Sequence, residues 1–491
     1  MEDKMKADLI VKNGIVVTNE GLIKGGVAAK DGVIVAIAAD ENLPEAEKEY
    51  DAKGLLIMPG VIEPHCHLGL DKNEDGSFKG VERYIEDVAT ESKAAAVGGI
   101  TTINTTVEGL GPGGKRFYGV KNKMENAKPA LDNAYVDIKY YLGVKDDEEI
   151  AEFNELRDEG LLSCAKVFLG FKGAAAKVFG HPEEGYSNDF LFRAARDLAA
   201  QKGPVQLMVH CEDASVMNYM APAIEAEGPV CGNYIDLYDR SRPGFLEAMD
   251  LCKMAYITHY HNCPLYIVHI SAKETVDQLE WFQSKGYKIT GETCLHYLLL
   301  ASDDPICFEN PDWNNMAKVS PPIRNSSNRD ALWRGVMNGS ITCIGTDHVN
   351  YSAHTNKLGG SFWDAPGGCG DGMSLLMTAL FSEGVVKRKM PVEDFTKLMS
   401  ENPAKALGIY PQKGAIRIGS DFDVVVFDPH EKWKFSFEDT YSTHYGSIYE
   451  EREFQGRPKA TFVRGTMIAE NGKIVVGKPT GKYVKNSTTT Y

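Results

Sequence analysis

The chain has 491 residues, 43% hydrophobic and 25% charged, which is ordinary globular usage and excludes a disordered chain, a collagen and a coiled-coil rod. Its 53 basic and 69 acidic side chains give a formal charge of −16, which argues against a nucleic-acid partner and favours a protein that acts on small molecules. The length fits one barrel of about 250 residues or more with an accessory domain.

No apolar run reaches the roughly 18 residues that would indicate a membrane span, so no membrane association is expected. The start of the chain, Met1–Lys4, is charged and lacks the apolar core of a secretion signal. The ten cysteines are scattered and form no CxxC pair. Reduced thiols and a cytoplasmic location are therefore expected.

Residues 1–58 consist of short strand-like runs broken by turns. Asp8–Lys12 and Ile15–Val17 flank Asn13-Gly14, and a second pair of strand-like runs flanks Asp31-Gly32. Asn-Gly and Asp-Gly between apolar runs predict β-hairpins. This segment is expected to form the first part of a small β-sandwich.

Residues 59–390 alternate between short apolar runs and longer amphipathic segments. A repeating strand–helix pattern predicts a parallel sheet, and this many repeats predict a TIM-like (β/α)8 barrel. The expected strands after the first include Ile100–Asn104, Gly160–Leu169, Val205–His210, Leu265–Ile270, Tyr287–Glu292 and Ile341–Gly345.

Residues 391–477 combine a helical segment with strands such as Ala460–Arg464 and Thr466–Glu470. These strands and those of residues 1–58 could complete one β-sandwich from both ends of the chain. Residues 478–491 form a polar tail, expected either to be loose or to lie on a neighbouring subunit.

Two histidines, His65 and His67, follow the apolar run Leu55–Ile62. In a strand, side chains two residues apart point the same way, so both imidazoles would face one ligand near the strand's carboxyl end. One such pair is a weak signal, but His210 and His269 also end apolar strand-like runs. The carboxyl ends of barrel strands converge, so the four imidazoles predict a zinc-like metal site.

Asp347 follows another strand-like run, where a carboxylate can bind a metal and also accept a proton. Lys166 lies inside the apolar run Leu161–Leu169, where an ammonium is disfavoured. A neutral lysine amine can take up carbon dioxide, and the resulting carbamate can bridge two metal ions. Lys177 repeats the local Lys-Val-Phe sequence but lacks a preceding strand, so Lys166 is preferred.

The chain resembles the cyclic amidohydrolases, which include hydantoinases, dihydropyrimidinases, allantoinases and dihydroorotases. The resemblance extends nearly from end to end and is strongest to hydantoinase and dihydropyrimidinase. Besides the six residues already named, it rests on Met58–Ile62, Gly98–Thr102, Gly291–Tyr297, Ser320–Arg324, Gly345–His348, Asn402–Lys405 and Lys413–Asp423.

The resemblance implies two divalent ions, most simply Zn²⁺, and a hydrolase that opens a cyclic amide by attack of a bridging hydroxide. The first ion would be held by His65, His67 and Asp347, and the second by His210 and His269. Carboxylated Lys166 (N6-carboxylysine) would bridge the two ions, and Asp347 would carry the proton to the departing nitrogen. A homotetramer is also implied.

The resemblance further implies substrate contacts from Phe171, Ser320 and Asn338. Phe171 occupies the position of a tyrosine that donates a hydrogen bond to the developing oxyanion in the family, and phenylalanine has no such donor. Leu68–Asn73 lacks an arginine that would grip dihydroorotate. A dihydropyrimidine, a hydantoin, an allantoin-like ureide and a less familiar cyclic amide all remain open, as does a non-catalytic assembly relative.

Overall fold

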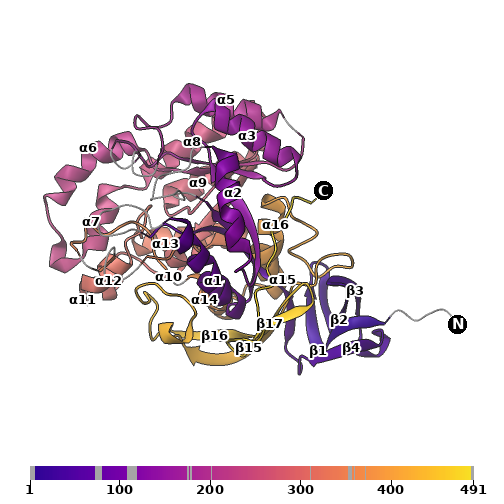
Figure 1. Ribbon diagram of the computed structural model, residues 1–491. Coiled ribbons are helices and arrows are strands. Elements are labelled where there is room, and N and C mark those ends of the chain that lie inside the picture. The colour runs from indigo at the N-terminus through magenta and orange to yellow at the C-terminus, as the bar shows by residue number, and fades with distance from the viewer. Residues whose placement is uncertain are drawn as a thin grey trace.

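The computed structural model describes residues 6–71, 80–107, 119–173, 176, 180–200, 202–309, 311–351, 357–358, 360–370 and 372–487 (Figure 1). Two nine-stranded sheets organise these residues, one inside a ring of helices and one beside it. No helix in these ranges is long and apolar enough to cross a membrane.

The first sheet is parallel throughout, in the order β13-β12-β11-β10-β9-β8-β7-β6-β14. Its last segment, β14, continues the chain two residues beyond β13 and pairs with β6, which closes the sheet on itself. A TIM-like barrel is therefore confirmed, with nine strand segments because the chain leaves and re-enters the sheet around Asp347. The strands are β6 Val61–His67, β7 Ile100–Thr106, β8 Asp137–Gly143, β9 Cys164–Phe168, β10 Gln206–His210, β11 Leu265–Ile267, β12 Ile289–Cys294, β13 Ile341–Gly345 and β14 His348–Val349.

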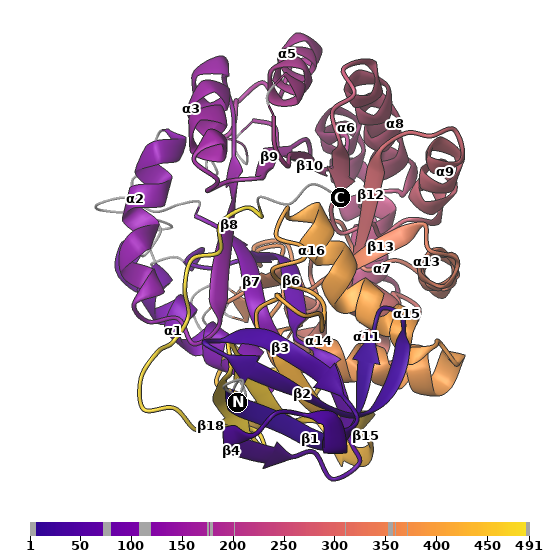
Figure 2. The same cartoon turned by 90° about the vertical axis from the view of Figure 1, so that its right-hand side faces the viewer.

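Helices surround this sheet (Figure 2). Helix α5 shows why the sequence folds this way: the Ser187 side chain accepts a hydrogen bond from the N–H of Phe190 and caps the first turn. Its buried side chains recur at helical spacing and face the strands. The main helices are α1 Val81–Val97, α2 Val120–Leu131, α3 Asp147–Asp158, α5 Asn188–Ala199, α6 Ala214–Glu225, α7 Tyr234–Ser241, α8 Phe245–Tyr260, α9 Lys273–Ser284, α13 Ser326–Asn338 and α14 Gly372–Leu380.

Shorter helical segments complete the shell of the barrel and connect it to the C-terminal strands. Two of them, Phe381–Lys387 and Lys397–Glu401, are π-helical and continue α14 and α15. The others are α10 Leu295–Leu299, α11 Ile306–Glu309, α12 Pro311–Met316, α15 Val392–Thr396 and α16 Asn402–Ala406.

The second sheet combines both ends of the chain, as the sequence indicated. It runs β18-β17-β16-β15-β5-β1-β2-β3, with β4 paired to β1, so one hydrogen-bonded path joins the strands. The path curls over, because Tyr50 of β4 packs on Phe462 of β16 with ring centroids 5.5 Å apart. The antiparallel pairing of β15 with β5 joins the two ends. The strands are β1 Ala7–Thr18, β2 Gly21–Lys30, β3 Val33–Ala38, β4 Ala46–Asp51, β5 Leu56–Pro59, β15 Val424–Lys434, β16 Glu453–Val463, β17 Thr466–Glu470 and β18 Lys473–Ile474.

The hairpin expected at Asn13-Gly14 is absent, because β1 runs through both residues as one strand. Asn13 adopts a φ of 57° and the register with β2 shifts there, so the pair forms a bulge. A Cβ on Gly14 would lie 2.6 Å from Cδ1 of Ile57, so a larger residue here would have to displace that side chain. The hairpin expected at Asp31-Gly32 is confirmed and joins β2 to β3.

The described part of the tail packs on its own chain and is not loose (Figure 2). The N–H of Val484 donates to the carbonyl of Ile138, and the Tyr483 hydroxyl donates to the carbonyl of Leu161. Lys139, fully buried inside β8, donates to the side chain of Asn486 at 2.7 Å. The tail therefore covers the amino ends of β8 and β9.

A buried ion cluster joins the barrel to the second sheet. Lys413 Nζ lies 2.5 Å from Asp137, at the start of β8, and 2.8 Å from both Asp421 and Asp423, which precede β15. Burial opposes the charge of Lys413, but the three carboxylates raise the pKa of its ammonium above the usual value. Although the carboxylates are spaced like metal ligands, the Lys413 ammonium lies among them and the Arg464 guanidinium also pairs with Asp137.

Replacing Lys413 with Met should lower the free energy of unfolding by about 3–5 kcal/mol, because the substitution leaves buried carboxylates without their cation. Urea unfolding followed by circular dichroism measures the change. Lys434→Met removes an exposed ion pair with Glu451 and serves as the control, with an unchanged midpoint expected. Equal midpoints for the two variants would show that the cluster does not stabilise the fold.

Candidate metal centre

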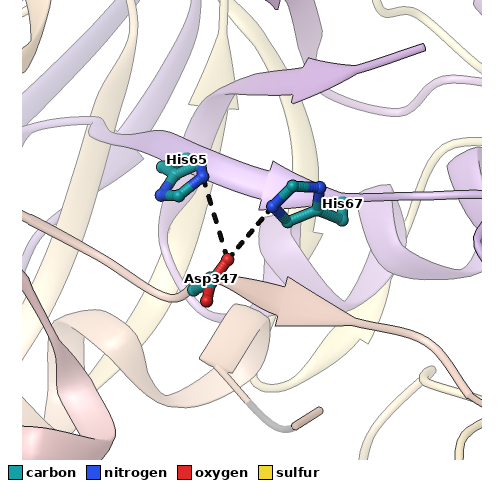
Figure 3. Close-up of side chains that lie close together, drawn as sticks. All are labelled: His65, His67 and Asp347. Carbon is teal, nitrogen blue, oxygen red and sulfur yellow. Dashed lines mark ion pairs between the residues drawn. The ribbon is translucent and has the colours of Figure 1, made fainter. Parts of the chain in front are cut away.

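Two histidines of β6 and one aspartate form one of two groups of possible metal ligands in the described residues, the other being the three carboxylates around Lys413. His65 and His67 point to the same side of their strand, with ring centroids 5.2 Å apart. Asp347 Oδ1 lies 3.2 Å from His67 Nε2 and 3.8 Å from His65 Nε2 (Figure 3). One ligand atom from each residue lies within 4.8 Å of the others, so a single cation can be reached by all three.

The backbone holds Asp347 in place against β6. Its N–H donates to the carbonyl of His65 at 2.9 Å, in the gap between β13 and β14. Asp347 adopts a φ of 48°, and His269 one of 41°, both in the left-handed region that non-glycine residues seldom occupy. Such local strain persists where the surrounding structure fixes it, and it occurs often at functional sites.

The protonation states suit a cation. Burial lowers the pKa of His65 well below its usual value, so the imidazole is neutral and offers a lone pair. Burial alone would raise the pKa of Asp347, but the hydrogen bond from His67 and the nearby imidazoles hold it below its usual range. A neutral imidazole and an ionised carboxylate are the ligand forms that Zn²⁺ binds.

The other two predicted histidines form a second pair beside the first group. His210 ends β10 and His269 follows β11, and their ring centroids are 4.5 Å apart. His269 also lies 5.5 Å from His65, centroid to centroid. Burial and the neighbouring His210 lower the pKa of His269, and its Nδ1 is buried without a hydrogen-bond partner among the described residues. An uncompensated buried nitrogen of this kind fits a ligand to a cation.

Lys166 lies between the two groups. It is fully buried in β9, and its Nζ is 3.2 Å from His65 Nε2. After burial itself, the charge of Lys166 is the next largest influence that lowers the pKa of His65, and it also lowers that of His269. The structure thus brings all six predicted ligands together. Lys177, the alternative lysine, lies outside the described residues.

Buried carboxylates that the sequence analysis did not single out orient these ligands. Glu292, on β12, has Oε1 3.0 Å from His65 Nδ1 and accepts the backbone N–H of His269 at 3.1 Å. Burial raises the pKa of Glu292 to about 8, and the Tyr266 hydroxyl donates to its other oxygen. A partner on Nδ1 directs the Nε2 lone pair of His65 toward Asp347.

Glu212 supports the second pair in the same way. Its Oε2 lies 3.4 Å from His210 Nε2 and 2.8 Å from Arg242, so the guanidinium balances its buried charge. Glu63 accepts the backbone N–H groups of His65 and Thr346, and so ties β6 to the end of β13. Glu63 lies two residues before His65, and Glu212 lies two residues after His210. Side chains two residues apart in an extended chain point the same way, so this spacing could have identified both glutamates from the sequence.

A cavity of about 260 Å³ opens onto these ligands. Its volume fits a small ring rather than an extended polymer. Phe171 and Ser320 line it, as the resemblance implied, and the Ser320 hydroxyl lies 2.7 Å from the Tyr238 hydroxyl. Its wall also includes His67, Leu70, Phe168, His181, His210, His269, Asp347, Val349, Tyr351, Asp364, Pro366, Gly367 and Gly368.

Asn338 does not reach this cavity, which corrects the expectation that it contacts a substrate there. It is the exposed last residue of α13, and its side chain donates to Glu280 at 2.8 Å. Asn338 precedes the amino end of β13, whereas Asp347 follows the carboxyl end. The five residues of β13, at about 3.3 Å per residue, therefore separate Asn338 from the site.

Two buried lysines hold one wall of the cavity, residues 361–370. Lys318 Nζ donates to three backbone carbonyls of this segment at 2.6–3.0 Å. Lys357 Nζ donates to the carbonyls of Pro366 and Gly368, and to that of Lys318, at 2.5–2.8 Å. Burial lowers the pKa of Lys318 to about 8 and that of Lys357 to about 7. The lysine N–H groups replace water at carbonyls that would otherwise be unsatisfied.

Replacing Lys357 with Met should raise the KM for a substrate about tenfold with little change in kcat, because the cavity wall loses its hydrogen bonds while the volume is kept. Steady-state kinetics of the purified variant measure both constants. Lys389→Met is the control, since Lys389 Nζ bonds a single backbone carbonyl at the surface. An unchanged KM for Lys357→Met would contradict this role.

Comparison with known proteins agrees with this geometry. Residues 56–475 match the Amidohydrolase family. A D-hydantoinase of Ralstonia pickettii is 31% identical over 97% of this chain and 98% of its own, and an allantoinase of Escherichia coli is 31% identical over 98% and 99%. The crystal structure of dihydropyrimidinase from Brevibacillus agri superposes with a TM-score of 0.84 at 28% identity, over 98% of this chain and 99% of that one. The resemblance to the cyclic amidohydrolases is thus confirmed, and the chain belongs to the amidohydrolase family.

Proposed function

We propose that this protein is a metal-dependent hydrolase that opens a cyclic amide, such as a hydantoin or a dihydropyrimidine-like ring. The observation that carries the proposal is the convergence of His67, His210, His269 and Asp347 on one ring-sized cavity, with His65 and buried Lys166 in contact with each other beside Asp347. The relatives named hydantoinase, allantoinase and dihydropyrimidinase, each matched over nearly its whole length, support the same reaction class.

Two divalent cations, most simply Zn²⁺, fit the donor set. His65, His67 and Asp347 would hold one cation, and His210 and His269 the other. Lys166 would join the two sites after its amine takes up carbon dioxide and releases a proton, which gives a carbamate with two oxygens. When bound, such cations polarise a carbonyl and lower the pKa of water to near neutrality.

The protein's own groups position the ring and move the proton. The Oδ1 atom of Asp347 faces the imidazoles, so its second carboxylate oxygen can accept a proton from the attacking water. The same oxygen then returns the proton to the ring nitrogen as the carbon–nitrogen bond breaks. Oxygen from water is added to the carbonyl carbon, and the product is an open-chain amide acid.

The cavity favours a substrate with an apolar portion. Phe168, Phe171 and Leu70 are apolar residues of its wall. A hydantoin or a dihydropyrimidine fits this description, and an allantoin-like ureide or another cyclic amide is the alternative. A non-catalytic assembly relative is disfavoured, because such a relative should have lost several of the ligand residues that are all present here.

We also infer a cytoplasmic, homotetrameric enzyme, on the strength of family resemblance and cysteine chemistry. The ten cysteines are all free thiols, and most are buried, which suits a reducing compartment. Sedimentation analysis of the purified protein measures the oligomer size.

The proposed function predicts that His65→Ala and His210→Ala lose bound zinc and activity together while keeping the fold. Zinc content, circular dichroism and turnover of hydantoins, dihydrouracil and allantoin provide the three measurements. His259→Ala is the matched control, because His259 is exposed and stacks on Tyr287 away from the cavity. Full activity of a metal-free protein would refute the proposal.

Carboxylation of Lys166 predicts a separate outcome. Lys166→Ala should lose at least about 100-fold in kcat, and short-chain carboxylic acids should restore part of it by supplying bridging oxygens. Native mass spectrometry of the wild type should show one added carbon dioxide that is absent in the variant. Lys434→Ala, at an exposed ion pair, should change neither the mass increment nor the activity. A free amine at Lys166 in active, metal-loaded protein would contradict the prediction.

A further inference from the structure

A fifth imidazole lies in the cavity, and the proposed metal set does not use it. His181 belongs to the connection between β9 and α5 and is 9% exposed. It lines the cavity together with His210, His269 and Asp347. No expectation from the sequence included it, because it stands in a loop and at no strand end.

The ring of His181 is held from several sides. It stacks on Phe168 with centroids 4.5 Å apart and on Phe171 with centroids 5.7 Å apart, each at an interplanar angle of 27°. The Tyr186 hydroxyl lies 3.2 Å from Nδ1, and the backbone N–H of His181 donates to the carbonyl of Ala176. We assign the Tyr186 hydroxyl as the donor to Nδ1, which leaves the single N–H of the neutral imidazole on Nε2.

This imidazole lies close to the proposed centre. The two rings that His181 stacks on are also neighbours of His210, with Phe171 5.6 Å and Phe168 6.5 Å from it, centroid to centroid. The intervening backbone is tight, since a Cβ on Gly170 would lie 2.4 Å from His210 Nε2. The segment from Phe168 to Phe171 therefore connects His181 to the proposed metal ligands through direct contacts.

Few other side chains of the cavity can donate a hydrogen bond to a substrate. Beyond the proposed ligands, the donors among its described lining residues are His181, Ser320 and Tyr351. The Ser320 hydroxyl is already paired with Tyr238, and Tyr351 donates to the carbonyl of Gly367. Phe171 carries no donor at all. His181 supplies the N–H group at the aromatic side of the cavity.

We propose that His181 is a catalytic residue that donates its Nε2–H to the carbonyl oxygen under attack. The role rests on the proposed ring-opening reaction and adds to it a donor of the protein's own. As water adds to the carbonyl carbon, negative charge develops on that oxygen, and the hydrogen bond strengthens. The charge returns to the carbon–nitrogen bond as this bond breaks, and the imidazole gains and loses no proton.

The decisive variant is His181→Phe, which keeps an aromatic ring in the stack but removes both nitrogens. Its kcat should fall about 100-fold while KM changes little, because an oxyanion donor acts in the transition state. Zinc content and the thermal unfolding midpoint should stay at the wild-type values. His259→Phe, the same substitution at the exposed histidine, should leave kcat unchanged.

Two further variants separate a donor from a packing role. His181→Gln keeps an N–H and should retain more activity than His181→Phe. Phe171→Tyr places a hydroxyl beside the same part of the cavity, and in the His181→Phe background it should recover at least about tenfold of the lost kcat. If His181 only fills space, the Phe171→Tyr hydroxyl should not restore kcat to the His181→Phe variant.

The outcomes are distinguishable. An unchanged kcat for His181→Phe, or a loss of activity that follows a loss of zinc, would overturn the role of His181 and leave the proposed function standing. A wild-type protein that opens no hydantoin, dihydropyrimidine, allantoin or other cyclic amide would overturn both. A lower kcat with intact zinc, together with rescue by Phe171→Tyr, would establish the donor.

Discussion

Closure of the barrel is the constraint on which the site depends. Because β14 pairs with β6, the chain that leaves β13 must return beside His65 and His67. The turn between the two segments places Asp347 against them, and the hydrogen bond from its N–H to His65 holds it there. Without this pairing Asp347 would lie at one edge of an open sheet and His65 and His67 at the other.

The same arrangement places several buried carboxyl groups next to the imidazoles. Buried carboxylates are costly unless they are paired, and here each one has a specific partner. Glu292 accepts from Tyr266 and the backbone of His269, and Glu212 is balanced by Arg242. The carboxylates hold the imidazoles in fixed orientations. The side-chain entropy of these imidazoles is therefore lost when the protein folds and not when a cation binds.

The sequence was sufficient to predict the barrel and the ligands at its strand ends. Each strand can be recognised from its own apolar residues, and the carboxyl ends of barrel strands always converge on one site. The sequence failed where the outcome depends on contacts between distant segments. Asn13-Gly14 has the composition of a hairpin, but β1 continues through it as a bulge, with Gly14 close to the side chain of Ile57. Asn338 was assigned without regard to which end of β13 it occupies. His181 sits in a loop whose path no periodic pattern describes.

The second sheet sets an order of events during synthesis. Strands β1 to β5 leave the ribosome first, but β15, the partner that joins β5 to the C-terminal strands, begins only at Val424, after the whole barrel. At typical translation rates this delay lasts tens of seconds. During that time one edge of β5 is an unpaired apolar strand, open to pairing with another nascent chain. A design in which both ends of the chain share one sheet therefore couples the last step of folding to completion of the polypeptide.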